Sequence, residues 1–348
     1  MGLRRFSIAI AATCACALSG CAPAFVPGLA GPATYHAPGN GAGKVRLAVQ
    51  ESGKGKPIVL IHGLGTSSYT WNKIMPELAR TNRVIAIDLK GFGKSDKPLD
   101  GNYSIFDQAR LIEDTIRENN LSGVTLIGHS YGGAVALAVA LAQMENGGDR
   151  VERLVLLDSV AYRQPMPFFF QVLRTPVIGE IGMALIPPEV QAEHALTIAY
   201  YNGRKVPGEA VQHYAQPLHT EGGRHALFHT INSLEPDNAE AIAARYRNLK
   251  LPALVLWCDH DRIVPIKFGE RLAGDLPNAQ LRSSGAAGTF RMRSSPAKPC
   301  RRSSALWNCA CPRKRRQRPE PPPGKPAALN YCRFSHSYAS TPTRKASP

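Results

Sequence analysis

Short apolar segments, each long enough for one β-strand, recur along most of the chain after Lys44. They are rich in valine, isoleucine and leucine and are bounded by Gly, Pro or Asp, which favours strands buried on both faces of a mostly parallel sheet. These segments are residues 45–49, 58–62, 84–88, 124–128, 154–158 and 254–258. Longer stretches at 71–80, 105–119 and 134–143 have the pattern of helices. The alternation predicts an α/β fold with helices on both faces of the sheet.

The basic charge of the chain is concentrated at one end. The formal net charge is +16 over 348 residues, but residues 282–348 contain 15 Lys and Arg against one acid, Glu320. That segment alone has a net charge of +14, which leaves +2 for residues 1–281. The basic run Arg313-Lys314-Arg315-Arg316 could bind phosphates, but it belongs to this unusual tail. We therefore expect no nucleic-acid partner.

The first residues have the pattern of an export signal. Arg4 and Arg5 precede an apolar segment at 6–18, which is too short to span a bilayer as a mature helix. The following Leu-Ser-Gly-Cys21 resembles the bacterial lipobox, in which the signal is cleaved before a cysteine that receives a lipid. We expect a signal peptide at 1–20, lipid attachment at Cys21, a flexible tether at 21–43 and a location on the periplasmic side of the outer membrane. The alternative is an ordinary signal peptide with a chance cysteine.

Residues 160–245 interrupt the strand rhythm. They contain several prolines, the cluster Phe168-Phe169-Phe170, helical segments such as 192–201 and no clear strand. An insertion of this size between two sheet strands predicts a helical cap over the site, because ligands bind at the carboxyl ends of parallel strands. The core would then comprise 44–159 and 246–281. The alternative is a set of ordinary helices covering the sheet.

A Gly-x-Ser-x-Gly motif occupies residues 128–132, between a predicted strand and a predicted apolar helix. In this context the motif indicates a nucleophile elbow, a sharp turn that lifts the hydroxyl of Ser130 clear of the sheet. The helix start supplies the backbone N–H of Tyr131 for an oxyanion, and a second N–H would come from Leu64. We interpret His62, next to Leu64, as a residue that braces its loop rather than as a base.

Four motifs together resemble the α/β-hydrolase superfamily, in particular its capped branch of epoxide-hydrolase-like and carbon–carbon-hydrolase-like enzymes. The motifs lie at 62–65, 88–96, 128–133 and 257–265. Dehalogenases and epoxide hydrolases of this family have Asp at the elbow, so Ser130 implies hydrolysis of an ester, thioester, amide or activated carbon–carbon bond. The resemblance implies that Asp261 is the orienting carboxylate, with Asp158 the alternative position used by some relatives. Cys258 departs from the family, where glycine is usual.

The catalytic histidine that the family places after its acid is absent from the expected region. After His260 the next histidine is His336, deep in the basic tail. Codons that encode 288–296 can also be read, one frame away, as His-Val-Pro-His-Glu-Glu-Gln-Pro, which resembles the histidine loop of the family. We therefore hypothesise a frameshift near 281–285, with an out-of-frame and disordered tail at 282–348. The last strand and helix of the fold would be missing, which would expose the edge of the strand at 254–258.

These observations predict a serine hydrolase acting through an acyl-enzyme on a small apolar or aromatic acyl substrate, for which Phe168 to Phe170 are an indication. The alternative is a protein that binds ligands in the same pocket without catalysis, because it lacks the base. The sequence contains no metal, nucleotide or flavin motif, so no cofactor is expected. The only membrane contact expected is through the lipid at Cys21.

Overall fold

A computed structural model of the protein describes residues 33–37, 45–166, 168–175, 177–200 and 206–284. The signal peptide, Cys21 and the basic tail after Ser284 lie outside these residues, so the predictions made for them stay predictions. Among the described helices, none combines the length and the apolar composition needed to cross a bilayer.

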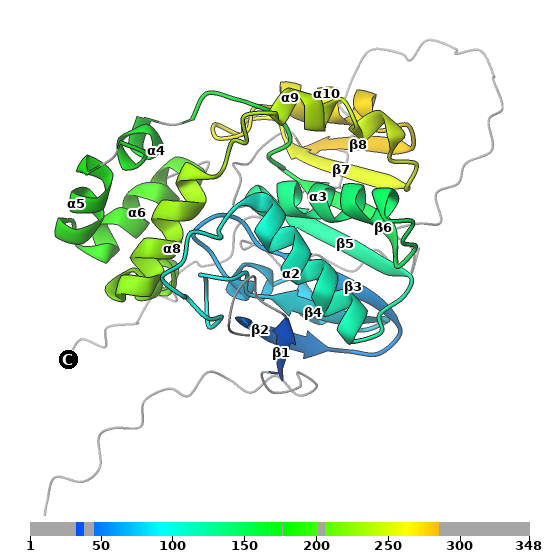
Figure 1. Ribbon diagram of the computed structural model, residues 1–348, viewed down its shortest axis with the longest axis horizontal. Coiled ribbons are helices and arrows are strands. Elements are labelled where there is room, and N and C mark those ends of the chain that lie inside the picture. Colours follow the sequence, from blue (N-terminus) through cyan, green and yellow to red (C-terminus); the bar gives the residue numbers. More distant parts are fainter. Residues whose placement is uncertain (1–32, 38–44, 167, 176, 201–205, 285–348) are drawn as a thin grey trace, which may run out of the picture.

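The fold is built on one sheet of eight strands in the order β1-β2-β4-β3-β5-β6-β7-β8 (Figure 1). The strands are β1 (Ala33–Ala37), β2 (Val45–Ser52), β3 (Lys56–Ile61), β4 (Asn82–Ile87), β5 (Val124–His129), β6 (Val151–Leu157), β7 (Ala253–Cys258) and β8 (Ala279–Ser284). β1 pairs antiparallel with β2, and β2 pairs antiparallel with β4. The other neighbours are parallel. The α/β class and all six predicted strands are confirmed.

Both ends of the sheet differ from the prediction. Ala33–Ala37, expected within the tether, forms β1, because the outer edge of β2 offers main-chain donors and acceptors that a further strand can satisfy. At the other edge, β8 pairs with β7 along its whole length, from Ala253↔Ala279 to Cys258↔Ser284. The prediction that the last strand is missing is therefore wrong, and β7 is not an exposed edge. The composition changes at Arg282, but ladder hydrogen bonds join backbone groups and tolerate that change. The helix predicted missing would fall outside the described residues.

The two faces of the sheet bury alternate residues of each strand, as the period of two requires. Val59 and Ile61 of β3 belong to the larger core, which contains residues of α2 (Ile105–Glu118), α3 (Tyr131–Glu145) and α10 (Ile266–Asp275). Ile58 and Leu60 face the smaller core, which includes Trp71 of η1 (Ser68–Trp71) and Met75 of α1 (Met75–Leu78). Figure 1 shows α2 and α3 side by side across one face.

Two of the three predicted core helices are confirmed, α2 and α3. α2 begins at a capping box, in which the Ser104 hydroxyl and the Asp107 carboxylate each accept a hydrogen bond from the backbone N–H of the other residue. α3 is buried nearly all round, as its apolar composition predicted. The helix predicted at 71–80 is wrong in extent, because the segment forms only η1 and the single turn α1. Pro76 has no N–H to continue the hydrogen-bond ladder from η1 into α1.

No strand is found in the described part of the chain between β6 and β7, which consists of helices joined by turns and loops. They are α4 (Phe168–Leu173), α5 (Ile178–Leu185), α6 (Pro188–Ala199), α7 (Gly208–Ala215), η3 (Gln216–His219), α8 (Glu221–Asn232), α9 (Ala239–Ala243) and η4 (Tyr246–Asn248). In Figure 1 α4, α5, α6 and α8 form a group beside the sheet, whereas α9 lies near α10. We call α4 to α8 the cap helices.

Candidate active site

Ser130 occupies the sharp turn between β5 and α3. Its backbone has φ 52° and ψ −119°, a conformation that residues other than glycine rarely adopt. Three main-chain hydrogen bonds hold the turn: the N–H of Ser130 donates to the carbonyl of Leu157 at 2.9 Å, and its carbonyl accepts from Gly133 at 2.9 Å and Val160 at 3.0 Å. The turn that follows β5 is therefore fixed by hydrogen bonds to the end of β6, to the loop after it and to the first turn of α3.

The glycines around Ser130 are required by close approach of other atoms. A Cβ at Gly128 would overlap the backbone of Gly132 and Gly133, and one at Gly132 would overlap the carbonyl oxygens of Ile61 and His62. At Gly133 the obstacle would be the side chain of Ser159. The motif read from the sequence thus corresponds to backbone packing between β3, β5 and α3.

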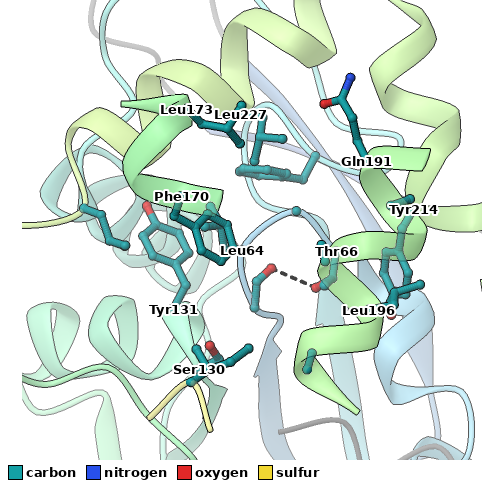
Figure 2. Close-up of a pocket in the computed structure, with 18 of the residues that line it drawn as sticks. Leu64, Thr66, Ser130, Tyr131, Phe170, Leu173, Gln191, Leu196, Tyr214 and Leu227 are labelled. Carbon is teal, nitrogen blue, oxygen red and sulfur yellow. Dashed lines mark hydrogen bonds between the residues drawn. The ribbon is translucent and has the colours of Figure 1, made fainter. Parts of the chain in front are cut away.

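Ser130 opens onto a cavity of about 140 Å³ between the carboxyl end of the sheet and the cap helices (Figure 2). Leu64, Val160 and Ile263 line it from the core, and most of the cap residues on its walls are apolar. Those cap residues include Phe169, Phe170, Leu173, Ala192, Leu196 and Leu227, and Met166, just before α4, also lines the cavity. Phe168 does not line the cavity: its side chain is 78% exposed, so of the three phenylalanines only the second and third face the site.

The predicted oxyanion donors lie on either side of Ser130. Tyr131 is the first residue of α3, where a helix leaves its N–H groups without partners in the helix. Leu64 follows Gly63, at which a Cβ would lie 3.4 Å from the Cβ of Ser130. Both residues line the cavity. The Tyr131 phenol is fully buried, and burial raises its pKa, so it is neutral at physiological pH.

His62 is locked into the loop that carries Leu64. Its Nε2 accepts a hydrogen bond from the N–H of Leu89 at 2.9 Å, which leaves Nδ1 as the protonated nitrogen, 2.8 Å from the carbonyl of Gly63. Burial lowers the pKa of His62. These contacts agree with a bracing role and leave its Nε2 unable to accept a proton from Ser130.

The two candidate acids follow two neighbouring strands of the sheet, β6 and β7, and both are buried. The Oδ1 of Asp261, in the loop after β7, accepts the N–H groups of Ile263 at 2.7 Å and Val264 at 2.9 Å. Asp158, directly after β6, has φ 44° and accepts the N–H of Cys258 at 2.7 Å. Neither acid is among the residues that line the cavity, although Val160 and Ile263, each two positions further on, are.

Cys258 gives the acid pair a contact that the sequence did not predict. Its thiol donates to Oδ2 of Asp158 at 3.2 Å, so both oxygens of this carboxyl are held by one residue. Burial, and secondly the charge of Asp261, raise the pKa of Asp158 to about 7. The only signal in the sequence was the cysteine itself, at a position where the family usually has glycine.

The described residues contain no histidine between Asp261 and Ser284, where the family places its base. His260 is exposed and His129 is buried against Trp71 with the rings edge to face, and the chain after Ser284, which contains His336, lies outside the described residues. Sequence reasoning also missed the polar side chains of the cavity wall, Gln164, Gln191 and Tyr214. These three residues form no recognisable sequence motif. They come together only because the helices and loops of the 160–245 segment pack around the cavity.

A mostly parallel sheet with a serine on a strained turn at its carboxyl end, under a layer of inserted helices, defines the class of α/β hydrolases. A family model described as "alpha/beta hydrolase fold" matches residues 56–179. The 2-hydroxymuconate semialdehyde hydrolase of Pseudomonas sp. strain CF600 is 30% identical over 256 residues, which is 71% of this chain and 85% of that protein. The chain therefore belongs to the α/β-hydrolase family, and it is a hydrolase of that family.

Solved structures agree with this assignment. An α/β hydrolase fold protein from Burkholderia ambifaria is 28% identical, with a TM-score of 0.63 over 72% of this chain and 90% of that one. The epoxide hydrolase CorEH has the same TM-score, over 75% of this chain and 93% of its own, at 23% identity. At this lower identity, the likeness to CorEH shows a shared fold and nothing more.

Proposed function

We propose that this chain is a serine hydrolase that acts on a carboxylic ester, or a related acyl or activated carbon–carbon bond, through an acyl-enzyme on Ser130. The observation that carries the proposal is the position of Ser130, on a strained turn at the floor of an apolar cavity. The apolar walls favour a small substrate whose acyl part is aliphatic or aromatic.

The proposed reaction has two steps. The Ser130 oxygen bonds to the acyl carbon as its proton passes to a base, and the carbonyl electron pair moves onto the oxygen bound by the N–H groups of Tyr131 and Leu64. Collapse of this intermediate breaks the bond to the leaving group, which takes the proton. Water then cleaves the acyl-serine in the same manner and releases the acid. Asp261 would orient the base.

The base decides between two functions for this chain. In the first, a residue after Ser284 supplies it. In the second, the protein binds acyl compounds in the cavity without turning them over. One observation favours the second: within the sequence, the only histidine after His260 is His336.

Serine labelling separates the two functions. The purified full chain is incubated with a fluorophosphonate and, separately, with short-chain aryl esters, and the site of labelling is located by mass spectrometry. Labelling at Ser130 with ester turnover supports the hydrolase, and both should disappear in S130A. Absence of both, in a protein that still binds the ester, supports the binding protein.

The frameshift hypothesis has its own test. Resequencing the gene around codon 283 either finds or excludes an insertion or deletion there. A chain expressed with the reading frame restored would carry a histidine loop after β8, and we expect its ester hydrolysis to exceed that of the present chain by up to about 10⁶-fold, the cost of losing the base in a serine protease. The matched control is the same restored chain with S130A. If the restored chain hydrolyses esters no faster than the present chain, the hypothesis is contradicted.

We also propose that the protein is anchored to the membrane by a lipid on Cys21. The support for this proposal is the lipobox-like sequence before that cysteine. Cells fed a radiolabelled fatty acid should label the wild-type chain but not C21S. A C21S chain that is labelled as strongly as the wild type would contradict the proposal.

A further inference from the structure

Gln191, in cap helix α6, is a polar side chain in a mostly apolar wall of the cavity. Its side chain is 4% exposed and lines the same cavity as Ser130. Figure 2 shows Gln191 and Ser130 at opposite ends of the pocket, with Leu173 and Leu227 near the Gln191 end and Leu196 and Tyr214 along one side. A ligand bonded to Ser130 would therefore extend toward Gln191 across apolar surface.

The orientation of the Gln191 amide is determined by its nitrogen. Nε2 donates to the carbonyl oxygens of Met183 at 3.2 Å and Ile186 at 2.7 Å, so both of its hydrogens have acceptors. Exchange of the two amide ends would place Oε1 against two carbonyl oxygens, where acceptors repel each other. The two hydrogen bonds of Nε2 therefore fix which end of the Gln191 amide is the oxygen.

Oε1 of Gln191 has no hydrogen-bond partner among the described residues, although the atom is buried. A buried acceptor without a donor is costly, and such groups in native proteins are commonly completed by a water or a ligand. Two other polar side chains of the cavity wall have partners: Thr66 donates to the carbonyl of Gly63 at 2.8 Å, and Gln164 donates to that of Ile263 at 3.3 Å. The buried hydroxyl of Tyr131, which also lines the cavity, has no partner among the described residues either, but it can itself donate, whereas Gln191 Oε1 can only accept. Gln191 Oε1 can therefore accept a hydrogen bond from a donor group of a ligand in the cavity.

We infer that the preferred substrate is an acyl compound whose apolar chain ends in a neutral hydrogen-bond donor, a hydroxyl or an N–H group, which Gln191 Oε1 accepts at the end of the cavity away from Ser130. This inference rests on the proposed function for the orientation of the ligand. Chains that end in a methyl group leave the oxygen unsatisfied, and chains that end in an ether or ketone bring a second acceptor to it.

Ligand binding to S130A tests the inference without requiring turnover. The probes are methyl esters of straight-chain acids with six to ten carbons, each compared with its ω-hydroxy counterpart by isothermal titration calorimetry. We expect one chain length at which the ω-hydroxy ester binds about five to ten times more tightly than its alkyl partner, the gain from one additional hydrogen bond. Alkyl esters that bind as tightly or more tightly at every length would overturn the inference.

Two further variants in the S130A background identify the residue responsible. Q191L should abolish the preference for the hydroxyl while the binding of alkyl esters is kept. Q164L, the same change elsewhere on the cavity wall, should preserve the preference. A preference that survives in Q191L overturns the assignment to Gln191. If Q191L does not fold, the unbranched Q191M replaces it, and the ligand pairs on S130A decide by themselves.

Failure of the inference and failure of the proposed function have different signatures. A protein that is not labelled at Ser130 and does not cleave esters can still prefer ω-hydroxy ligands through Gln191. Conversely, a protein that is labelled and turns over esters with no hydroxyl preference keeps the proposed function and loses only this substrate class.

Discussion

The core and the cap of this protein hold their parts of the site in different ways. Around Ser130 the backbone itself is packed, with glycines against carbonyl oxygens and three main-chain hydrogen bonds on one residue. The cap helices pack through side chains in two smaller apolar clusters, and several large apolar side chains remain exposed on them. These are Phe168, Val177, Ile178, Ile181, Leu185, Ile186 and Val190.

This difference separates the chemistry from the selection of substrate. The crowded backbone of the turn leaves Ser130 almost no freedom, as the role of nucleophile proposed for it would require. Side-chain packing in the cap tolerates substitutions of similar volume, so the cavity can change shape while the elbow stays unchanged. The cap is therefore the part of this chain in which specificity can change at low cost.

The largest difference between the two regions is expected for matched glycine substitutions. G132A would force a Cβ into the carbonyl oxygens of Ile61 and His62, and we expect it to lower the free energy of unfolding by about 3 kcal/mol. G182A, in cap helix α5, meets no atom within 4 Å and should be neutral or stabilising by up to about 1 kcal/mol. Urea unfolding of the two variants measures both effects. Similar losses of unfolding free energy in G132A and G182A would contradict the proposed difference between core and cap packing.

The second prediction concerns the buried acid of the core. The pKa of Asp158 is raised from 3.8 to about 7 by burial and by Asp261, so in this range the folded chain binds a proton that the unfolded chain has released. Its contribution to stability is present below pH 3.8 and is lost as the pH rises through about 7, by up to about 1.4 kcal/mol per pH unit.

D158N removes this titration, and asparagine tolerates the positive φ of the position. The stability of D158N relative to the wild type should therefore rise between pH 4 and 7 and remain constant above that, as measured by urea unfolding at several pH values. A difference between D158N and the wild type that does not vary with pH would show that Asp158 does not hold its proton.

The smallest effect is expected on the outer face of the cap. Leu185 is 77% exposed, so L185Q removes little buried apolar surface and should change the free energy of unfolding by less than about 0.5 kcal/mol. Thermal unfolding of the variant at matched concentration provides the measurement. A loss above 1 kcal/mol would mean that this side chain is buried in solution.

Much of the core could be predicted because its signals are local. The apolar runs identified six strands, and the elbow glycines identified the turn at Ser130. The errors in the sheet lie where long-range pairing decides: β8 forms on the edge of β7 despite the basic composition that begins at Arg282, and β1 forms on the edge of β2. An edge strand depends on the free backbone groups of its neighbour, which the strand's own residues do not reveal.

The amino-acid sequence by itself determined the α/β architecture, the sharp turn at Ser130 and the family, because strand periodicity and this turn depend on residues adjacent in the chain. Only the tertiary structure decided that Cys258 bonds to Asp158, that the charge of Asp261 acts on Asp158, and that Gln191, with its unsatisfied oxygen, lines the cavity of Ser130. Those relations join residues up to about a hundred positions apart, and their energies arise from burial and from exclusion of water, which exist only after the chain has folded.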